Sequence, residues 1–126
     1  MHPSPSVLIV DRSEENREVL TTALQRKGIR TYSAARAGRG AELAQSLHPD
    51  LIVLDLELDH NSPEKLCSRF AASGAKKAPI VLLGNLHRGA APPAEEIVGK
   101  PYHYGPLVRR IEEILAAGAQ QVAESA

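Results

Sequence analysis

The sequence is poor in several residue types that particular functions require. Cys67 is the single cysteine, so an internal disulfide is excluded and a cysteine-based zinc site is not expected. There is no tryptophan and only 3% of residues are aromatic, too few for a base-stacking surface or a membrane-interface belt. Lysine and arginine (15) balance aspartate and glutamate (15), so the chain lacks the cationic surplus of proteins that bind nucleic acid directly. No apolar run approaches the roughly 20 residues that span a bilayer.

These absences favour a cytoplasmic protein whose partners are neither nucleic acid nor membrane. The chain has 126 residues, of which 43% are hydrophobic and 24% charged, as expected of one soluble domain. The Pro- and Ser-rich residues 1–6 predict a disordered leader, and they carry no secretion signal. Residues 7–117 form the predicted domain. Residues 118–126 are small and polar, and we expect a C-terminal tail or a frayed helix end there.

Apolar runs alternate along the chain with segments of helical periodicity. Unbroken apolar runs at 7–10, 51–54 and 80–83 are typical of strands covered on both faces, 29–33 alternates like a more exposed strand, and 97–98 is a weak fifth. Helices are predicted from the Ser13 cap to Gly28, over 37–47, from Pro63 to Ser73-Gly74, and from Gly105-Pro106 onward. This alternation predicts an α/β fold with a parallel sheet and right-handed crossovers.

The connection between the fourth and fifth strands is short for a helix with two loops. Residues 84–96 include Pro92-Pro93, which a continuous helix does not tolerate. We therefore predict that a fourth helix is absent there or reduced to one turn.

Ionisable residues gather where the predicted strands end. Asp11 and Asp55 each follow a buried strand, and Lys100 follows the fifth. Carboxyl ends of parallel strands form the working edge of such sheets. Carboxylates bind Mg²⁺ or attack phosphorus, and a lysine amine neutralises phosphoryl oxygens. The alternative is that both aspartates cap turns and the lysine is solvated.

Four segments carry a resemblance to a known family: Val7-Leu-Ile-Val-Asp11 with the Glu15-Asn-Arg-Glu-Val-Leu20 that follows it, His48-Pro-Asp-Leu-Ile-Val-Leu-Asp-Leu56, Ala78-Pro-Ile-Val-Leu-Leu83 and Val98-Gly-Lys-Pro101. In this order they resemble the receiver domains of bacterial two-component response regulators. The resemblance implies a flavodoxin-like, doubly wound sheet of five parallel strands in the order 2-1-3-4-5. It also implies that Asp55 is the phospho-acceptor, that Lys100 pairs with the phosphoryl group, and that Asp11, Asp55 and the main-chain carbonyl of Glu57 hold Mg²⁺.

Among the departures from the family pattern, three concern the metal site and the switch. Arg12 stands where the family has a second metal-binding acid, Gly84 replaces the switch Ser or Thr, and Ile97 replaces the switch aromatic. Mg²⁺ is held by few protein carboxylates, so the loss of one predicts a weak metal site. The Arg12 guanidinium either pairs with Asp55 or Asp11, or points into solvent.

These departures favour a degenerate receiver, poorly phosphorylated at Asp55, that acts through contacts with a histidine kinase or another signalling protein rather than as an enzyme. A working phospho-acceptor receiver is the main alternative. Two others are an aspartate-nucleophile phosphatase, suggested by Asp55-Leu-Glu57, and a metal site built from the loop residues His60, His87 and His103. Cys67 fits a small core residue better than a reactive thiol.

Overall fold

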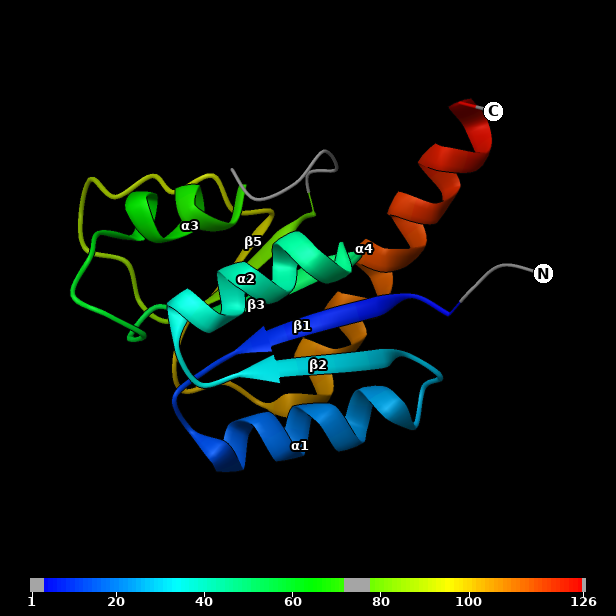
Figure 1. Ribbon diagram of the computed structural model, residues 1–126, viewed down its shortest axis with the longest axis horizontal. Helices are drawn as coiled ribbons and strands as arrows, with labels where there is room; N and C mark the ends of the chain where they lie inside the picture. The colour runs from blue at the N-terminus through cyan, green and yellow to red at the C-terminus, as the bar shows by residue number, and fades with distance from the viewer. Residues whose placement is uncertain (1–3, 72–77, 126) are drawn as a thin grey trace.

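Five parallel strands form one sheet, as predicted. The structure, a computed structural model, describes residues 4–71 and 78–125 of the chain. The strand order is β2-β1-β3-β4-β5 (Figure 1). The strands are β1 (Ser6–Val10), β2 (Arg30–Ala34), β3 (Leu51–Asp55), β4 (Ile80–Leu83) and β5 (Glu96–Val98). The predicted α/β class and the order 2-1-3-4-5 are therefore confirmed.

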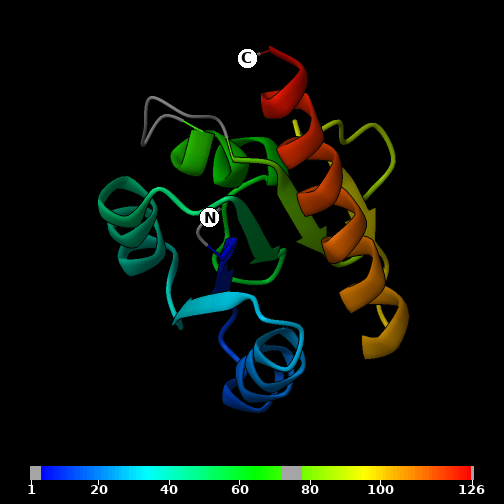
Figure 2. The ribbon, with the colours of Figure 1, turned by 90° about the vertical axis from the view of Figure 1, so that its right-hand side faces the viewer.

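Helices cover both faces of this sheet. They are α1 (Glu14–Gln25), α2 (Ala37–Leu47), α3 (Pro63–Ala71) and α4 (Tyr104–Ser125). Figures 1 and 2 show α1 and α4 on one face and α2 and α3 on the other. Alternate strand residues enter two separate cores: Ile9 and Val53 pack on the α1/α4 side, and Leu8 and Ile52 pack on the α2/α3 side. Both faces of the strands are buried, which explains why their sequences are unbroken apolar runs.

The connection from β4 to β5 contains no helix, as predicted. Residues 84–95 run as turns and irregular backbone. The segment is fixed by polar contacts, because the Ala91 N–H donates to Glu64 Oε1 at 2.8 Å and the Glu95 N–H donates to the Ile80 carbonyl at 2.8 Å. The Ala91 hydrogen bond lowers the pKa of the Glu64 carboxyl.

Regular structure extends beyond both predicted ends of the domain. Strand β1 begins at Ser6, and the Arg30 N–H donates to the Pro5 carbonyl at 2.9 Å, so the end of the predicted disordered leader takes part in the sheet edge. Helix α4 continues to Ser125, so of the two expectations for the segment after residue 117 the structure has the helix end. The predicted stop of α3 at Ser73-Gly74 lies outside the described residues, as do residues 1–3. None of the helices that the structure describes combines the length and apolarity needed to cross a bilayer.

Gly40 gives a stability prediction on α2. A Cβ at this buried position would lie 2.8 Å from Val10 Cγ2 and 3.1 Å from Phe70 Cζ. Overpacking should outweigh the better helix propensity of alanine, so Gly40→Ala should lower the free energy of unfolding by about 1–2 kcal/mol.

Gly38→Ala is the matched control on the same helix, because the atom nearest to the added Cβ would be Arg69 Nη2 at 3.6 Å, an ordinary contact. It should raise stability by about 0.5 kcal/mol. Urea denaturation measures both, and equal changes would contradict the packing explanation.

Candidate functional site

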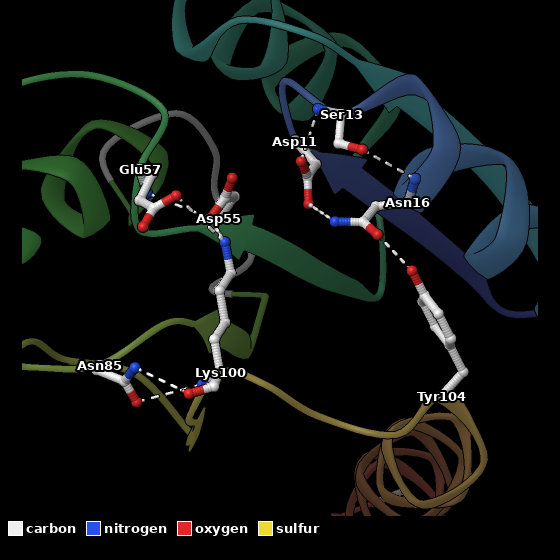
Figure 3. Close-up of polar contacts among 8 residues, drawn as sticks. All are labelled: Asp11, Ser13, Asn16, Asp55, Glu57, Asn85, Lys100 and Tyr104. Atoms are coloured by element: carbon white, nitrogen blue, oxygen red, sulfur yellow. Dashed lines mark hydrogen bonds and ion pairs between the residues drawn. The ribbon is translucent and has the colours of Figure 1, made fainter.

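The carboxyl ends of the strands surround one polar cavity. Asp11 directly follows β1, Asp55 ends β3, and Lys100 lies just beyond β5. A cavity of about 570 Å³ is lined by Asp11, Arg12, Ser13, Asn16, Asp55, Glu57 and Lys100. The structure therefore brings together the charged residues that the sequence singled out, and Figure 3 shows most of them.

Asp55 and Lys100 form the central ion pair of the cavity. Asp55 is 5% exposed, and its Oδ1 lies 2.7 Å from Lys100 Nζ (Figure 3). The same oxygen accepts the Glu57 N–H at 3.2 Å, which fixes the carboxylate at the end of β3. Partial burial opposes the charged form of Lys100, but the Asp55 hydrogen bond and the charges of Asp55, Glu57 and Asp11 outweigh it and raise the pKa of Lys100.

Asp11 is held by the start of α1. It is 1% exposed, and its Oδ1 accepts the Ser13 N–H at 2.8 Å while Oδ2 lies 3.4 Å from Asn16 Nδ2. Ser13 also caps α1, as predicted, because its side chain accepts the Asn16 N–H at 3.2 Å. Burial raises the pKa of Asp11, and the nearby Asp55 charge adds to that rise. The two negatively charged carboxylates therefore repel each other unless a cation compensates their charge.

Arg12 borders the cavity without neutralising it. Its side chain is exposed, and among the described residues it forms no ion pair with Asp11 or Asp55. Of the two alternatives that the sequence left open for this guanidinium, the structure has the solvent-facing one. Among the described residues, the cation that contacts Asp55 is Lys100.

Glu57 contributes a second contact to the lysine. Its Oε2 lies 3.6 Å from Lys100 Nζ, although the side chain is 79% exposed. The sequence predicted a role only for its main-chain carbonyl. An exposed pair of this kind adds little to stability, so Asp55 remains the main partner of Lys100.

Gly84 and Ile97 lie away from the cavity lining. Gly84 has a φ of +143°, and a Cβ there would lie 2.7 Å from Leu56 Cβ. Its N–H donates to the Val98 carbonyl at 2.9 Å, which joins the ends of β4 and β5. Ile97 is 40% exposed on β5. Position 84 is therefore adapted to a residue without a side chain.

Sequence reasoning missed three polar residues around the cavity. Asn16 links Asp11 to α4, because it contacts Asp11 and accepts a hydrogen bond from the Tyr104 hydroxyl (Figure 3). Asn85 bonds the main chain of Lys100 twice, with Nδ2 donating to the carbonyl at 3.0 Å and Oδ1 accepting the N–H at 3.2 Å. An amide residue two positions after a buried strand was the available signal for Asn85, since it falls on the working edge of the sheet.

Other candidate groups receive less support. Among residues 4–71 and 78–125, no three His, Cys, Asp or Glu side chains are placed to hold a metal ion. His60, His87 and His103 therefore do not form the site considered from the sequence. Cys67 is fully buried in the α2/α3 core, and burial raises its pKa to about 11, so it is a core residue as predicted.

Known proteins match most of the chain in sequence. The family described as the response regulator receiver domain matches residues 7–112. The transcriptional regulatory protein AfsQ1 of Streptomyces coelicolor is 30% identical over 128 residues, covering 97% of this chain and 56% of that protein. The transcriptional regulatory protein CusR of Escherichia coli is 32% identical over 126 residues, covering 94% of this chain and 55% of that protein. The chain thus spans about half the length of these relatives.

Solved structures agree on the fold. A CheY-like receiver domain protein from Methanospirillum hungatei superposes with a TM-score of 0.83 at 18% identity, covering 94% of this chain and 98% of that one. The signal receiver domain of a putative Luxo repressor protein from Vibrio parahaemolyticus gives a TM-score of 0.84 at 16% identity, covering 98% of both chains. With the match to the family along nearly the whole domain, the chain belongs to the receiver domain family of two-component response regulators.

Proposed function

We propose that this receiver domain accepts a phosphoryl group at Asp55 only poorly and signals mainly through contacts with other proteins. The observation that carries the proposal is the composition of the cavity. It holds two buried carboxylates, Asp11 and Asp55, with Lys100 on one and the cation Arg12 at its rim. Phosphorylation would join an Asp55 carboxylate oxygen to phosphorus and break the bond from phosphorus to its leaving group.

The donor set supports weak rather than strong Mg²⁺ binding. Asp11, Asp55 and the main-chain carbonyl of Glu57 are the groups that would hold the ion, which supplies positive charge to phosphoryl oxygens when bound. Within the described residues, Asp55 Oδ2 has no protein hydrogen-bond partner, so this oxygen of the Asp55 carboxylate is open to a ligand. Arg12 places a permanent positive charge where a further carboxylate would attract the ion.

Positions 84 and 97 support a role that does not depend on phosphorylation. Gly84 offers no hydroxyl to a phosphoryl group, and Ile97 offers no aromatic ring that could move with it. Residues 84–95 also form irregular backbone without a helix, so a loop shapes this surface. A domain with these features is suited to being recognised in one conformation by a protein partner.

A working phospho-acceptor receiver is the second candidate function. The convergence of Asp11, Asp55 and Lys100 on one cavity favours it, because these three residues retain the charges that the reaction needs. Under either function we infer that the partner is a histidine kinase or another signalling protein. The curated relatives are named as transcriptional regulators, but the balanced charge of this chain favours neither direct nucleic-acid binding nor a membrane partner.

The variant Arg12→Asp tests the metal part of the proposal. Arg12 is exposed and forms no ion pair within the described part of the chain, so the substitution should leave the fold intact. A third carboxylate beside Asp11 and Asp55 should lower the metal-free melting temperature. Mg²⁺ at a hundredfold excess over its dissociation constant should then stabilise the variant by about 2.7 kcal/mol.

Thermal melts with and without Mg²⁺ measure this effect. The melting temperature of Arg12→Asp should rise with Mg²⁺ while that of the parent stays nearly constant. Arg36→Asp is a control, because this exposed arginine precedes α2 and does not line the cavity. A parent that responds to Mg²⁺ as strongly as Arg12→Asp would support the working receiver instead.

A further inference from the structure

Asn85 joins the loop after β4 to the loop after β5. Its side-chain amide forms a pair of hydrogen bonds to one residue, donating from Nδ2 to the Lys100 carbonyl at 3.0 Å and accepting the Lys100 N–H on Oδ1 at 3.2 Å (Figure 3). A side chain that bonds both polar groups of one residue fixes the position and the orientation of that main-chain segment. Lys100 lies beyond the last β4–β5 ladder pair, Leu83 with Val98, so the ladder itself does not hold it.

The side chain of Lys100 starts from this fixed main chain. It crosses the cavity to place Nζ 2.7 Å from Asp55 Oδ1 and 3.6 Å from Glu57 Oε2. A lysine side chain samples many rotamers, and holding it in one of them costs conformational entropy. Because the main chain of Lys100 is already fixed, the ion pair with Asp55 has only the side chain left to immobilise.

Gly99 provides an independent sign that this contact is built into the local structure. A Cβ at position 99 would lie 2.8 Å from Asn85 Oδ1. The absence of a side chain there lets the amide approach the chain at Lys100. The backbone on the other side is also adapted, since Gly84 turns the chain at a φ of +143° directly before Asn85.

We propose that Asn85 is a positioning residue that holds Lys100 on Asp55 through its two main-chain hydrogen bonds. Gly84, directly before Asn85, has no side chain that could make this contact. This inference rests on the proposed function in one respect, namely that the ion pair of Lys100 with Asp55 belongs to the functional site. The hydrogen bonds themselves do not depend on whether Asp55 is phosphorylated.

Lysine labelling with an acylating reagent, read by peptide mass spectrometry, tests the proposal. Labelling requires the Lys100 amine to leave Asp55, whereas the exposed Lys65 and Lys27 provide internal references in the same molecule. In the parent, Lys100 should react more slowly than Lys65. In Asn85→Ala, its rate relative to Lys65 should rise about five- to tenfold, as expected when a hydrogen bond of ordinary net strength is lost.

A second pair of variants separates positioning from general destabilisation. Gly99→Ala keeps Asn85 but displaces its amide, so it should raise Lys100 labelling in the same direction. Gly105→Ala, whose Cβ would have no atom within 4 Å, should leave it unchanged. If Asn85→Ala unfolds the protein, the labelling rates of Lys65 and Lys27 should change as well. The Lys100 rate in Gly99→Ala then decides the outcome.

Two results would overturn the proposal. One is a parent in which Lys100 reacts as fast as Lys65. The other is an unchanged Lys100 rate in folded Asn85→Ala or folded Gly99→Ala. Because labelling needs no phosphoryl donor, efficient phosphorylation of the parent would remove the proposed function and leave the Asn85 result standing.

Discussion

Replacing Lys100 by methionine should lower the free energy of unfolding by about 2–4 kcal/mol at pH 7. The reason is the pair of carboxylates that the substitution leaves behind. Asp11 and Asp55 are almost fully buried, and Lys100 is the cation in contact with Asp55. Methionine keeps the apolar stem and removes the charge. The expected value lies toward the low end of losses for broken buried pairs because the Lys100 side chain is 26% exposed.

The loss should depend on pH in a direction set by two raised pKa values. The pKa of Lys100 is raised in the folded protein, so its contribution is complete below the ordinary lysine value of about 10.4 and disappears as pH rises through the folded value. Burial raises the pKa of Asp11, so this carboxyl takes up a proton at a higher pH than an ordinary aspartate. The difference between parent and Lys100→Met should therefore shrink as pH falls toward that raised value.

Urea denaturation at several pH values measures the effect. Arg39→Met is the control, since Arg39 pairs with Glu42 on the exposed surface of α2. It should change stability by less than about 0.5 kcal/mol at pH 7. An effect of Lys100→Met that is equally small would mean that the carboxylates do not need Lys100 for stability.

Restoring a hydroxyl by Gly84→Thr should lower the free energy of unfolding by about 2–5 kcal/mol. Two costs add at this position. A β-branched residue is disfavoured at a φ of +143°, and its Cβ would lie 2.7 Å from Leu56 Cβ, directly after β3. We therefore expect that a side chain at position 84 cannot be accommodated without displacing Leu56.

Gly89→Thr separates the two costs. Gly89 also has a positive φ, +89°, but a Cβ there would have no atom within 4 Å. This control should lose only the backbone contribution, about 1–2 kcal/mol. Equal losses in the two variants would mean that the contact with Leu56 costs nothing. A stable Gly84→Thr would mean that position 84 still accepts a switch residue.

Much of the fold could be predicted because its signals are local. Unbroken apolar runs such as residues 51–54 reflect burial on both faces of a parallel strand, and Pro92-Pro93 excludes a helix whatever the surroundings. The ends of the domain were less predictable. Whether Ser6 joins a strand depends on the distant Asp50, whose Oδ2 accepts its N–H at 2.8 Å, and small polar residues near Ser125 are compatible with helix or coil.

The candidate site was predictable where position along a strand determines it. Asp11, Asp55 and Lys100 meet because parallel strands end at one edge of the sheet. The remaining contacts depend on tertiary structure. Asn16 and Tyr104 are far apart in the sequence, and the Asn85–Lys100 contact needs both loops in place. The direction of the Arg12 side chain is likewise set by three-dimensional surroundings, so the sequence left both of its orientations open.

Phosphoryl occupancy of Asp55 tests the central claim most directly. The parent, Arg12→Asp and Asp55→Asn would be incubated with acetyl phosphate and Mg²⁺ and then compared by intact mass and peptide mapping. We expect a minor phosphoryl adduct on the parent, a larger one on Arg12→Asp, and none at position 55 in Asp55→Asn. A stoichiometric adduct at Asp55 of the parent would contradict the account and identify the domain as a working phospho-acceptor receiver.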